Sequence, residues 1–189
     1  MAGKREKRNN TDSALQGTAD LRAAAFPGET APDISGTAAS SPEDAYSQLK
    51  LSNQLCFPLY ACSRYVINQY NPYLKPLGIT YTQYLVFLVL WEEKEITVGD
   101  LCRKLYLDNG TISPVIKKME KDGYLKRCRK AADERVVMVC ITEKGMQLRE
   151  EARDIPFKVG SCLAMRQEDA ACLYRLLYGL LGQKAQEET

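Results

Sequence analysis

The segment most able to carry chemistry is NQLCFPLYACSRY, residues 53–65, which contains Cys56, Tyr60 and Cys62. A thiol near the start of a helix gains thiolate character from the positive end of the helix dipole, and nearby tyrosine hydroxyls can donate hydrogen bonds to a thiolate. The chain has 11 tyrosines, many of them within residues 60–84. Cys56 is therefore either a reactive thiol in a tyrosine-lined pocket or an ordinary core cysteine, and the residues alone leave both interpretations open.

The remaining composition restricts the possible chemistry. The seven cysteines form no CxxC pair, which argues against a zinc ribbon or a thioredoxin-like site and favours a reducing compartment with mostly free thiols. The chain contains no histidine, so it has no Ser-His-Asp triad, no Cys-His pair and no His-ligated metal site. We therefore predict a protein that is not an enzyme and that uses no cofactor or metal.

Length and hydropathy indicate one domain preceded by a tail. No apolar run approaches the roughly 20 residues of a membrane span, and residues 1–10 are basic and polar rather than a signal sequence. We therefore expect a cytoplasmic protein with no membrane partner. Residues 1–45 are rich in Ala, Ser, Thr, Gly, Pro and Asp and lack an apolar period, which predicts a disordered tail before a domain at 46–189.

The charge is unevenly distributed along the chain. The net charge is only +2, yet residues 103–135 contain ten Lys or Arg against five Asp or Glu. A local basic patch on a nearly neutral chain favours a polyanionic partner at one face, although a solvated helix face would have a similar composition.

Hydrophobic periodicity predicts a mainly α-helical domain with one β-hairpin. The expected elements are a helix over 45–70 that bends or restarts near Cys56 because of Pro58, a connector over 71–78, helices over 84–93, 97–105 and 109–122, strands over 124–128 and 136–141 around a polar loop at 129–135, a helix from 142 that ends before Pro156, and a last helix over 168–184.

Two closely spaced helices followed by a hairpin are the layout of a winged helix-turn-helix, with a DNA-binding part at about 95–142. The helix over 109–122 has an apolar face for the core and a polar face with hydroxyls for base edges and lysines for phosphates, although it could also be an ordinary amphipathic helix. The hairpin loop carries arginines that could enter the minor groove. The candidate DNA contacts are Asn109, Thr111, Ser113, Pro114, Lys117, Lys118, Arg129 and Arg135. The terminal helices, at about 46–72 and 150–185, are expected to form a dimer interface.

Several segments together resemble the MarR family of winged-helix transcription regulators, and more narrowly its organic-hydroperoxide-sensing branch. The matching segments are NQLCFPLYACSR at 53–64, ITYTQYLVFLVLWE at 79–92, LYLDNGTISPVIKKMEKDGYLKR at 105–127, DERVV at 133–137 and ITEKG at 141–145. The resemblance implies a homodimer that binds a pseudo-palindromic double-stranded DNA operator and represses a peroxidase gene, with an organic hydroperoxide as its signal.

The resemblance also implies roles for individual residues. Cys56 matches the peroxide-reactive cysteine, Tyr60, Tyr70 and Tyr81 match tyrosines of its pocket, and Arg135 matches the arginine of the wing that enters the minor groove. Cys162, which is expected just after the fifth helix, stands where a resolving cysteine from the other subunit would form a disulfide with oxidised Cys56. A mixed disulfide with a small thiol, a structural Cys56 in a regulator induced by a small phenolic ligand, and a thiol peroxidase are the alternatives.

Overall fold

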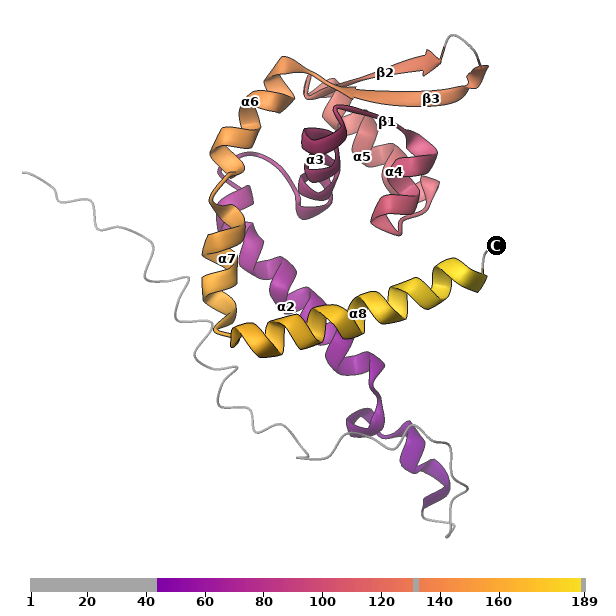
Figure 1. Cartoon of the computed structure of the whole chain (residues 1–189), viewed down its shortest axis with the longest axis vertical. Coiled ribbons are helices and arrows are strands. Elements are labelled where there is room, and N and C mark those ends of the chain that lie inside the picture. Colours follow the sequence, from indigo (N-terminus) through magenta and orange to yellow (C-terminus); the bar gives the residue numbers. More distant parts are fainter. Residues whose placement is uncertain (1–43, 131–132, 188–189) are drawn as a thin grey trace, which may run out of the picture. The chain divides into compact units, whose positions relative to one another are not determined.

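The computed structural model describes residues 44–130 and 133–187, with side chains for 46–127 and 137–182, and the chain divides into two units at residues 68 and 69. The elements in chain order are the 3₁₀ helices η2 (Asp44–Leu49) and η3 (Leu51–Asn53), then α2 (Cys56–Leu74), α3 (Tyr81–Glu93), β1 (Glu95–Thr97), α4 (Val98–Leu105), α5 (Asn109–Lys121), β2 (Leu125–Lys130), β3 (Asp133–Ile141), α6 (Glu143–Ala152), α7 (Ile155–Leu163) and α8 (Gln167–Glu187) (Figure 1). No helix within the described residues is long and apolar enough to cross a membrane.

The helix that contains the first cysteine begins at that cysteine. The predicted restart near Cys56 is confirmed, because two short 3₁₀ helices precede α2 in place of one continuous helix. Pro58 lies in the first turn of α2, where a backbone N–H would have no partner within the helix and its absence costs little. The predicted connector over 71–78 is wrong in its first half, because α2 runs through Pro72 to Leu74. Leu74 is buried in the core, and its packing stabilises this last turn.

Helix α3 is the centre of the core in the second unit. Thr80 caps it in a capping box with Gln83, so the helix begins three residues before the expected start at Tyr84. Val86, Phe87 and Leu90 have no exposed surface. Helix α3 contacts α4, α5 and α6, and Figure 1 shows it between α6 and the α4–α5 pair.

The predicted pair of short helices is confirmed. Thr97 caps α4 by accepting a hydrogen bond from the backbone N–H of Asp100. Asp108 caps α5, and Gly123, with φ of +79°, follows its C-terminal end. The apolar face of α5 is buried as its periodicity predicted, through Ile112, Ile116 and Met119.

The sheet has three antiparallel strands in the order β1-β3-β2, with Ile96 paired to Val139 and Leu125 paired to Ile141. Strand β1 was not predicted, because three residues give no usable period. The predicted seven-residue loop at 129–135 is wrong, since β2 continues to Lys130 and β3 begins at Asp133. Strand pairing uses backbone N–H and C=O groups, so a hairpin can extend beyond its apolar residues. Residues 131–132 lie outside the described residues.

Three helices follow the hairpin where two were predicted. Helix α6 ends at Ala152, before Pro156 as predicted, and Pro156 lies in the first turn of the additional helix α7, a position that proline favours. Cys162 therefore lies inside α7 rather than after a helix. The mainly α winged helix-turn-helix with a small sheet is confirmed, whereas the predicted disordered tail falls on residues 1–43, outside the described residues, and on the first two residues of η2.

Candidate nucleic-acid interface and thiol sites

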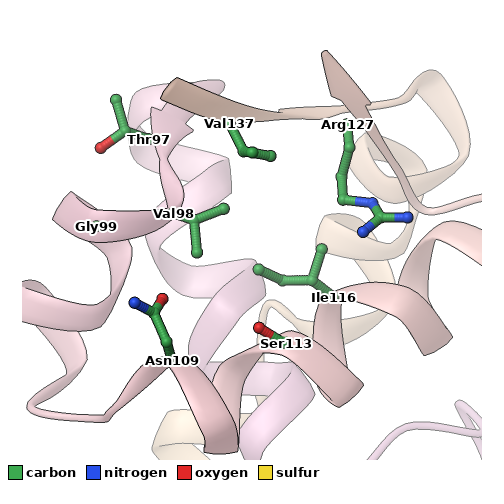
Figure 2. A pocket seen from close by; sticks show the side chains of 8 residues that line it. All are labelled: Thr97, Val98, Gly99, Asn109, Ser113, Ile116, Arg127 and Val137. Atoms are coloured by element: carbon green, nitrogen blue, oxygen red, sulfur yellow. The ribbon is translucent and has the colours of Figure 1, made fainter. Parts of the chain in front are cut away.

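An open groove lies between the start of α4, the exposed side of α5 and the hairpin. Its volume is about 490 Å³, and its lining residues are Thr97, Val98, Gly99, Asn109, Ser113, Ile116, Arg127 and Val137. Figure 2 shows Asn109 and Ser113 rising from α5 on one side and Arg127 and Val137 descending from the hairpin on the other. Two of the predicted DNA contacts therefore line one groove.

The first turn of α5 is held by the carboxylate of its capping residue. Asp108 Oδ1 accepts from the backbone N–H of Thr111 at 2.8 Å, and Asp108 Oδ2 accepts from the Thr111 hydroxyl at 2.9 Å. These two hydrogen bonds lower the pKa of Asp108, so the carboxylate is ionised near neutral pH. A Cβ at Gly110 would lie 2.9 Å from Asp108 Oδ1, and the absence of a side chain there leaves room for the cap.

A buried thiol contacts the same turn from α4. The Cys102 thiol donates a hydrogen bond to Asn109 Oδ1, with 3.4 Å between sulfur and oxygen. The side chain of Cys102 is only 9% exposed, and burial, together with the negative charge of Asp108, raises its pKa. Cys102 is therefore a neutral thiol that can donate.

The remaining predicted contacts on α5 are exposed. Ser113, Pro114 and Lys117 face solvent, and within the described part of the chain Lys117 has no carboxylate partner. Lys118 is different, because its ammonium lies 2.9 Å from Asp122 Oδ1, one turn along the helix. A phosphate would have to compete with Asp122 for Lys118.

Arg127 is a groove residue that the sequence reasoning missed. Its backbone N–H donates to Glu120 Oε1 at 3.1 Å, and its Nε donates to Glu120 Oε2 at 2.7 Å. These contacts join β2 to α5 and lower the pKa of Glu120. In the sequence, the available signal for this contact was the opposite charge of Glu120 and Arg127 on either side of the turn at Gly123. The predicted contacts Arg129 and Arg135 lie in β2 and β3, and their side chains fall outside the described residues.

The base of the hairpin is fixed to α3 and to the end of α5 by the first turn of α6. The Trp91 indole N–H donates to the carbonyl oxygen of Gly145 at 2.9 Å, and the Thr142 hydroxyl donates to the carbonyl oxygen of Gly123 at 2.7 Å. The Lys144 ammonium donates to the carbonyl oxygen of Asp122, also at 2.7 Å.

The first cysteine is exposed at the start of α2, within the unit that ends at residue 68. The Cys56 thiol donates to Gln54 Oε1 at 3.9 Å. Tyr60 is 57% exposed, and its hydroxyl accepts a hydrogen bond from Arg64 Nη1 at 2.8 Å. The helix start and the exposed thiol agree with what a sensing cysteine requires.

Two of the predicted pocket tyrosines lie together in the second unit. The ring centroids of Tyr70 and Tyr81 are 4.9 Å apart, and Tyr84, which was not predicted as a site residue, lies 5.6 Å from Tyr70 and 6.4 Å from Tyr81. Burial raises the pKa of Tyr70 and of Tyr81, and it raises the pKa of Tyr84 to about 12. All three phenols are therefore neutral hydrogen-bond donors at physiological pH.

Cys162 is exposed in α7 and pairs with a tyrosine of α2. The pKa of Tyr73 is raised, mainly by burial and to a lesser extent by the charge and the hydrogen bond of Cys162. Lys158, one turn before Cys162, places its ammonium 5.8 Å from the Tyr73 ring centroid. Among the residues that the structure describes, no group of three or more Cys, Asp or Glu side chains is arranged to hold a metal ion.

Known proteins identify the fold and the branch. The family model for the transcriptional regulator SarA/Rot matches residues 68–152. The organic hydroperoxide resistance transcriptional regulator of Bacillus subtilis is 45% identical over 139 residues, which cover 74% of this chain and 95% of that protein. The chain belongs to the MarR family, in its organic-hydroperoxide branch. As a MarR-family protein it is a transcription regulator and not an enzyme.

Solved MarR-family structures extend this comparison to AbfR of Staphylococcus epidermidis. Reduced AbfR bound to DNA is 34% identical, with a TM-score of 0.61, and covers 74% of this chain and 97% of the AbfR chain. Overoxidised AbfR bound to DNA is 36% identical, with a TM-score of 0.59, and covers 72% and 96%. Disulfide-formed AbfR is 35% identical, with a TM-score of 0.51, and covers 75% and 99%.

Proposed function

We propose that this regulator is a DNA-binding repressor that senses organic hydroperoxides through Cys56 and releases its operator when Cys56 is oxidised. The observation that carries the proposal is an exposed thiol at the first residue of α2, in a chain 45% identical to an organic hydroperoxide resistance regulator. The first residue of a helix lies at the positive end of the helix dipole, and exposure gives a peroxide access to the sulfur.

In this function the part of the chain at about 95–142 binds double-stranded DNA. Helix α5 inserts into the major groove, where Asn109, Thr111 and Ser113 meet base edges and Pro114 contacts the DNA surface. Lys117 and Lys118 bind phosphates, and the hairpin brings Arg129 and Arg135 to the minor groove. Three observations support this arrangement: the exposed polar side of α5, the adjoining groove, and the solved structure of reduced AbfR bound to DNA.

The segments at about 46–72 and 150–185 form the homodimer interface. Helix α8 supports this assignment, because large apolar side chains remain exposed along it, and a surface of this kind is normally covered by a partner. These side chains are Leu173, Tyr174, Leu176, Leu177, Tyr178 and Leu180. A two-fold symmetric dimer presents two copies of α5, so the operator is pseudo-palindromic.

The proposed chemistry has two steps. The Cys56 thiolate attacks the hydroperoxide, the O–O bond breaks, and the products are Cys56 sulfenic acid and, after protonation, the alcohol. The thiol of Cys162 of the partner subunit then displaces the sulfenic oxygen as water and forms a disulfide. Tyr60, Tyr70 and Tyr81 line the sensing pocket, where the hydroxyls of Tyr70 and Tyr81 hydrogen-bond reduced Cys56. Overoxidised AbfR bound to DNA supports assigning release to the disulfide rather than to oxygen on the sulfur alone.

The test uses a duplex that the reduced protein selects from a random library. Stoichiometric cumene hydroperoxide should abolish binding by the wild-type protein and produce a disulfide-linked dimer on a non-reducing gel. Cys56→Ser should bind DNA with or without peroxide. Cys162→Ser should gain one oxygen atom by mass, yet keep the DNA and form no linked dimer. Cys140→Ser, which removes a cysteine of β3 that has no part in the proposed thiol chemistry, should behave as wild type.

Binding that survives oxidation of the wild-type protein, or a Cys56→Ser protein that releases DNA on peroxide treatment, overturns the redox proposal. Release by salicylate with all thiols intact would identify a regulator induced by a phenolic ligand. Many turnovers of peroxide with a thiol reductant, without any effect on DNA binding, would identify a thiol peroxidase.

A further inference from the structure

Cys102 is buried beneath the DNA-reading helix and has no part in the redox chemistry proposed for Cys56 and Cys162. We propose that Cys102 orients the carboxamide of Asn109, so that the first turn of α5 meets DNA with Asn109 as a hydrogen-bond donor beside Thr111 as an acceptor. The inference rests on the proposed function, because it assigns base-reading chemistry to a helix that lies in the major groove.

A carboxamide has no intrinsic preference between the two orientations of its oxygen and its NH₂ group, so a neighbouring group decides which one faces a ligand. Cys102 supplies that neighbour across the turn between α4 and α5, with its thiol donating to Asn109 Oδ1. Because burial keeps the thiol protonated, it favours the carboxamide oxygen on its side. The Nδ2 group of Asn109, an exposed residue that lines the groove, is then left to donate to DNA (Figure 2).

The polarity of Thr111 is fixed by a separate hydrogen bond. Its hydroxyl proton is donated to Asp108 Oδ2, and the ionised carboxylate has no proton to return. The oxygen of Thr111 therefore offers only lone pairs to a ligand. The same carboxylate accepts the backbone N–H of Thr111, so rotation of the hydroxyl away from Asp108 would weaken the helix cap.

These two polarities specify the chemistry of the bases that α5 can read. A donor at Asn109 matches acceptors in the major groove, namely guanine O6 and N7, thymine O4 and adenine N7. An acceptor at Thr111 matches the amino groups of cytosine N4 and adenine N6. Asn109 and Thr111 are two residues apart on one turn, so they would read neighbouring positions rather than a single edge.

The experiment is selection from a random-sequence duplex library with the reduced, full-length protein, followed by sequencing. The position at which Asn109→Ala loses its base preference identifies the base pair that Asn109 reads. Cys102→Ala should reduce the preference at that same position by about five-fold. Cys102→Ser, whose hydroxyl can also donate, should restore it. Cys140→Ala, in β3 and not among the residues that line the groove, is the matched control, and thermal melting of each variant establishes that it is folded at the selection temperature.

Two results overturn the inference while leaving the proposed function intact. One is a Cys102→Ala protein that enriches the wild-type sequence with undiminished preference. The other is a Cys102→Ser protein that loses the preference as Cys102→Ala does. If Cys102→Ala is unfolded, Asn109→Asp decides, because an acceptor there should move the preference to cytosine or adenine, and an unchanged preference overturns the inference. A wild-type protein that enriches no sequence overturns the proposed function and this inference together.

Discussion

Replacing Gly145 by alanine should destabilise the fold, because the first turn of α6 lies directly against the base of the hairpin. A Cβ at this position would lie 2.4 Å from the carbonyl oxygen of Tyr124 and 2.7 Å from Ile141 Cγ1. The first neighbour is backbone, so it cannot rotate away. Relief requires α6 to move off the hairpin, which would also stretch the hydrogen bond from the Trp91 indole to the carbonyl oxygen of Gly145.

The magnitude follows from three contributions. Overpacking a filled site costs about 1–3 kcal/mol. A buried indole N–H that loses its acceptor costs about 1–3 kcal/mol more. Alanine in place of glycine within a helix offsets this by about 1 kcal/mol. The Gly145→Ala protein should therefore lose about 1–5 kcal/mol of the free energy of unfolding.

Urea denaturation at one fixed protein concentration, followed by circular dichroism, measures this loss. Gly160→Ala in α7 is the matched control, because a Cβ there meets no atom within 4 Å, and the helix should gain about 0.5–1 kcal/mol. A Gly145→Ala protein as stable as wild type would refute the reasoning about close packing at the base of the hairpin. Equal destabilisation by both variants would show that the contacts of Gly145 are not the cause.

Three further predictions concern hydrogen bonds and titration. Arg127 lowers the pKa of Glu120 from 4.5. The pair therefore stabilises the fold above about pH 4.5, and this stabilisation is lost as the pH falls through the pKa of Glu120 in the folded state. Glu120→Gln should flatten that part of the curve of unfolding free energy against pH. The pKa of Tyr84 is raised from 10.0 to about 12, so stability falls as the pH rises from 10 towards 12; Tyr84→Phe should remove one late-ionising tyrosine from an absorbance titration at alkaline pH. Thr80→Ala should cost about 1 kcal/mol of unfolding free energy, because the cap shared with Gln83 is lost.

Each of these predictions has a contradicting result. An acid limb that is unchanged in Glu120→Gln would mean that Arg127 does not bind Glu120 in solution. A tyrosine titration in which Tyr84→Phe removes an early phase would place Tyr84 at the surface. A Thr80→Ala protein with unaltered stability, set against a Thr82→Ala control inside the same helix, would remove the capping box from the account of α3.

The features that the sequence predicted are those encoded by local chemistry. Thr97 and Asp108 precede amphipathic helices and accept their first free N–H groups, so both caps were recognisable from residue type and spacing. The apolar period of α5 predicted its buried face for the same reason. Strand β1 was missed because its three residues are extended only by pairing with β3, a contact that no local pattern encodes.

The site residues that were missed depend on contacts between elements. Arg127 was read as one charge among several in a basic segment. The opposite charge of Glu120 across the turn at Gly123 was the available signal, but the two side chains meet only when that turn brings β2 back against α5. Cys102 appeared as one of several cysteines with no special spacing. Its importance arises only when the turn between α4 and α5 brings its thiol to Asn109.

The two kinds of cysteine in this chain differ in the surroundings that the fold gives them. Cys56 is exposed at the first residue of a helix, where its sulfur is open to an approaching peroxide. Cys102 is buried beside the carboxylate of Asp108, where a second negative charge is disfavoured and access is closed, so it stays a neutral thiol. Under the proposed function, a peroxide would oxidise Cys56 while Cys102 continued to hold the carboxamide of Asn109. In such a regulator, a signal would change affinity for the operator without changing which sequence is read.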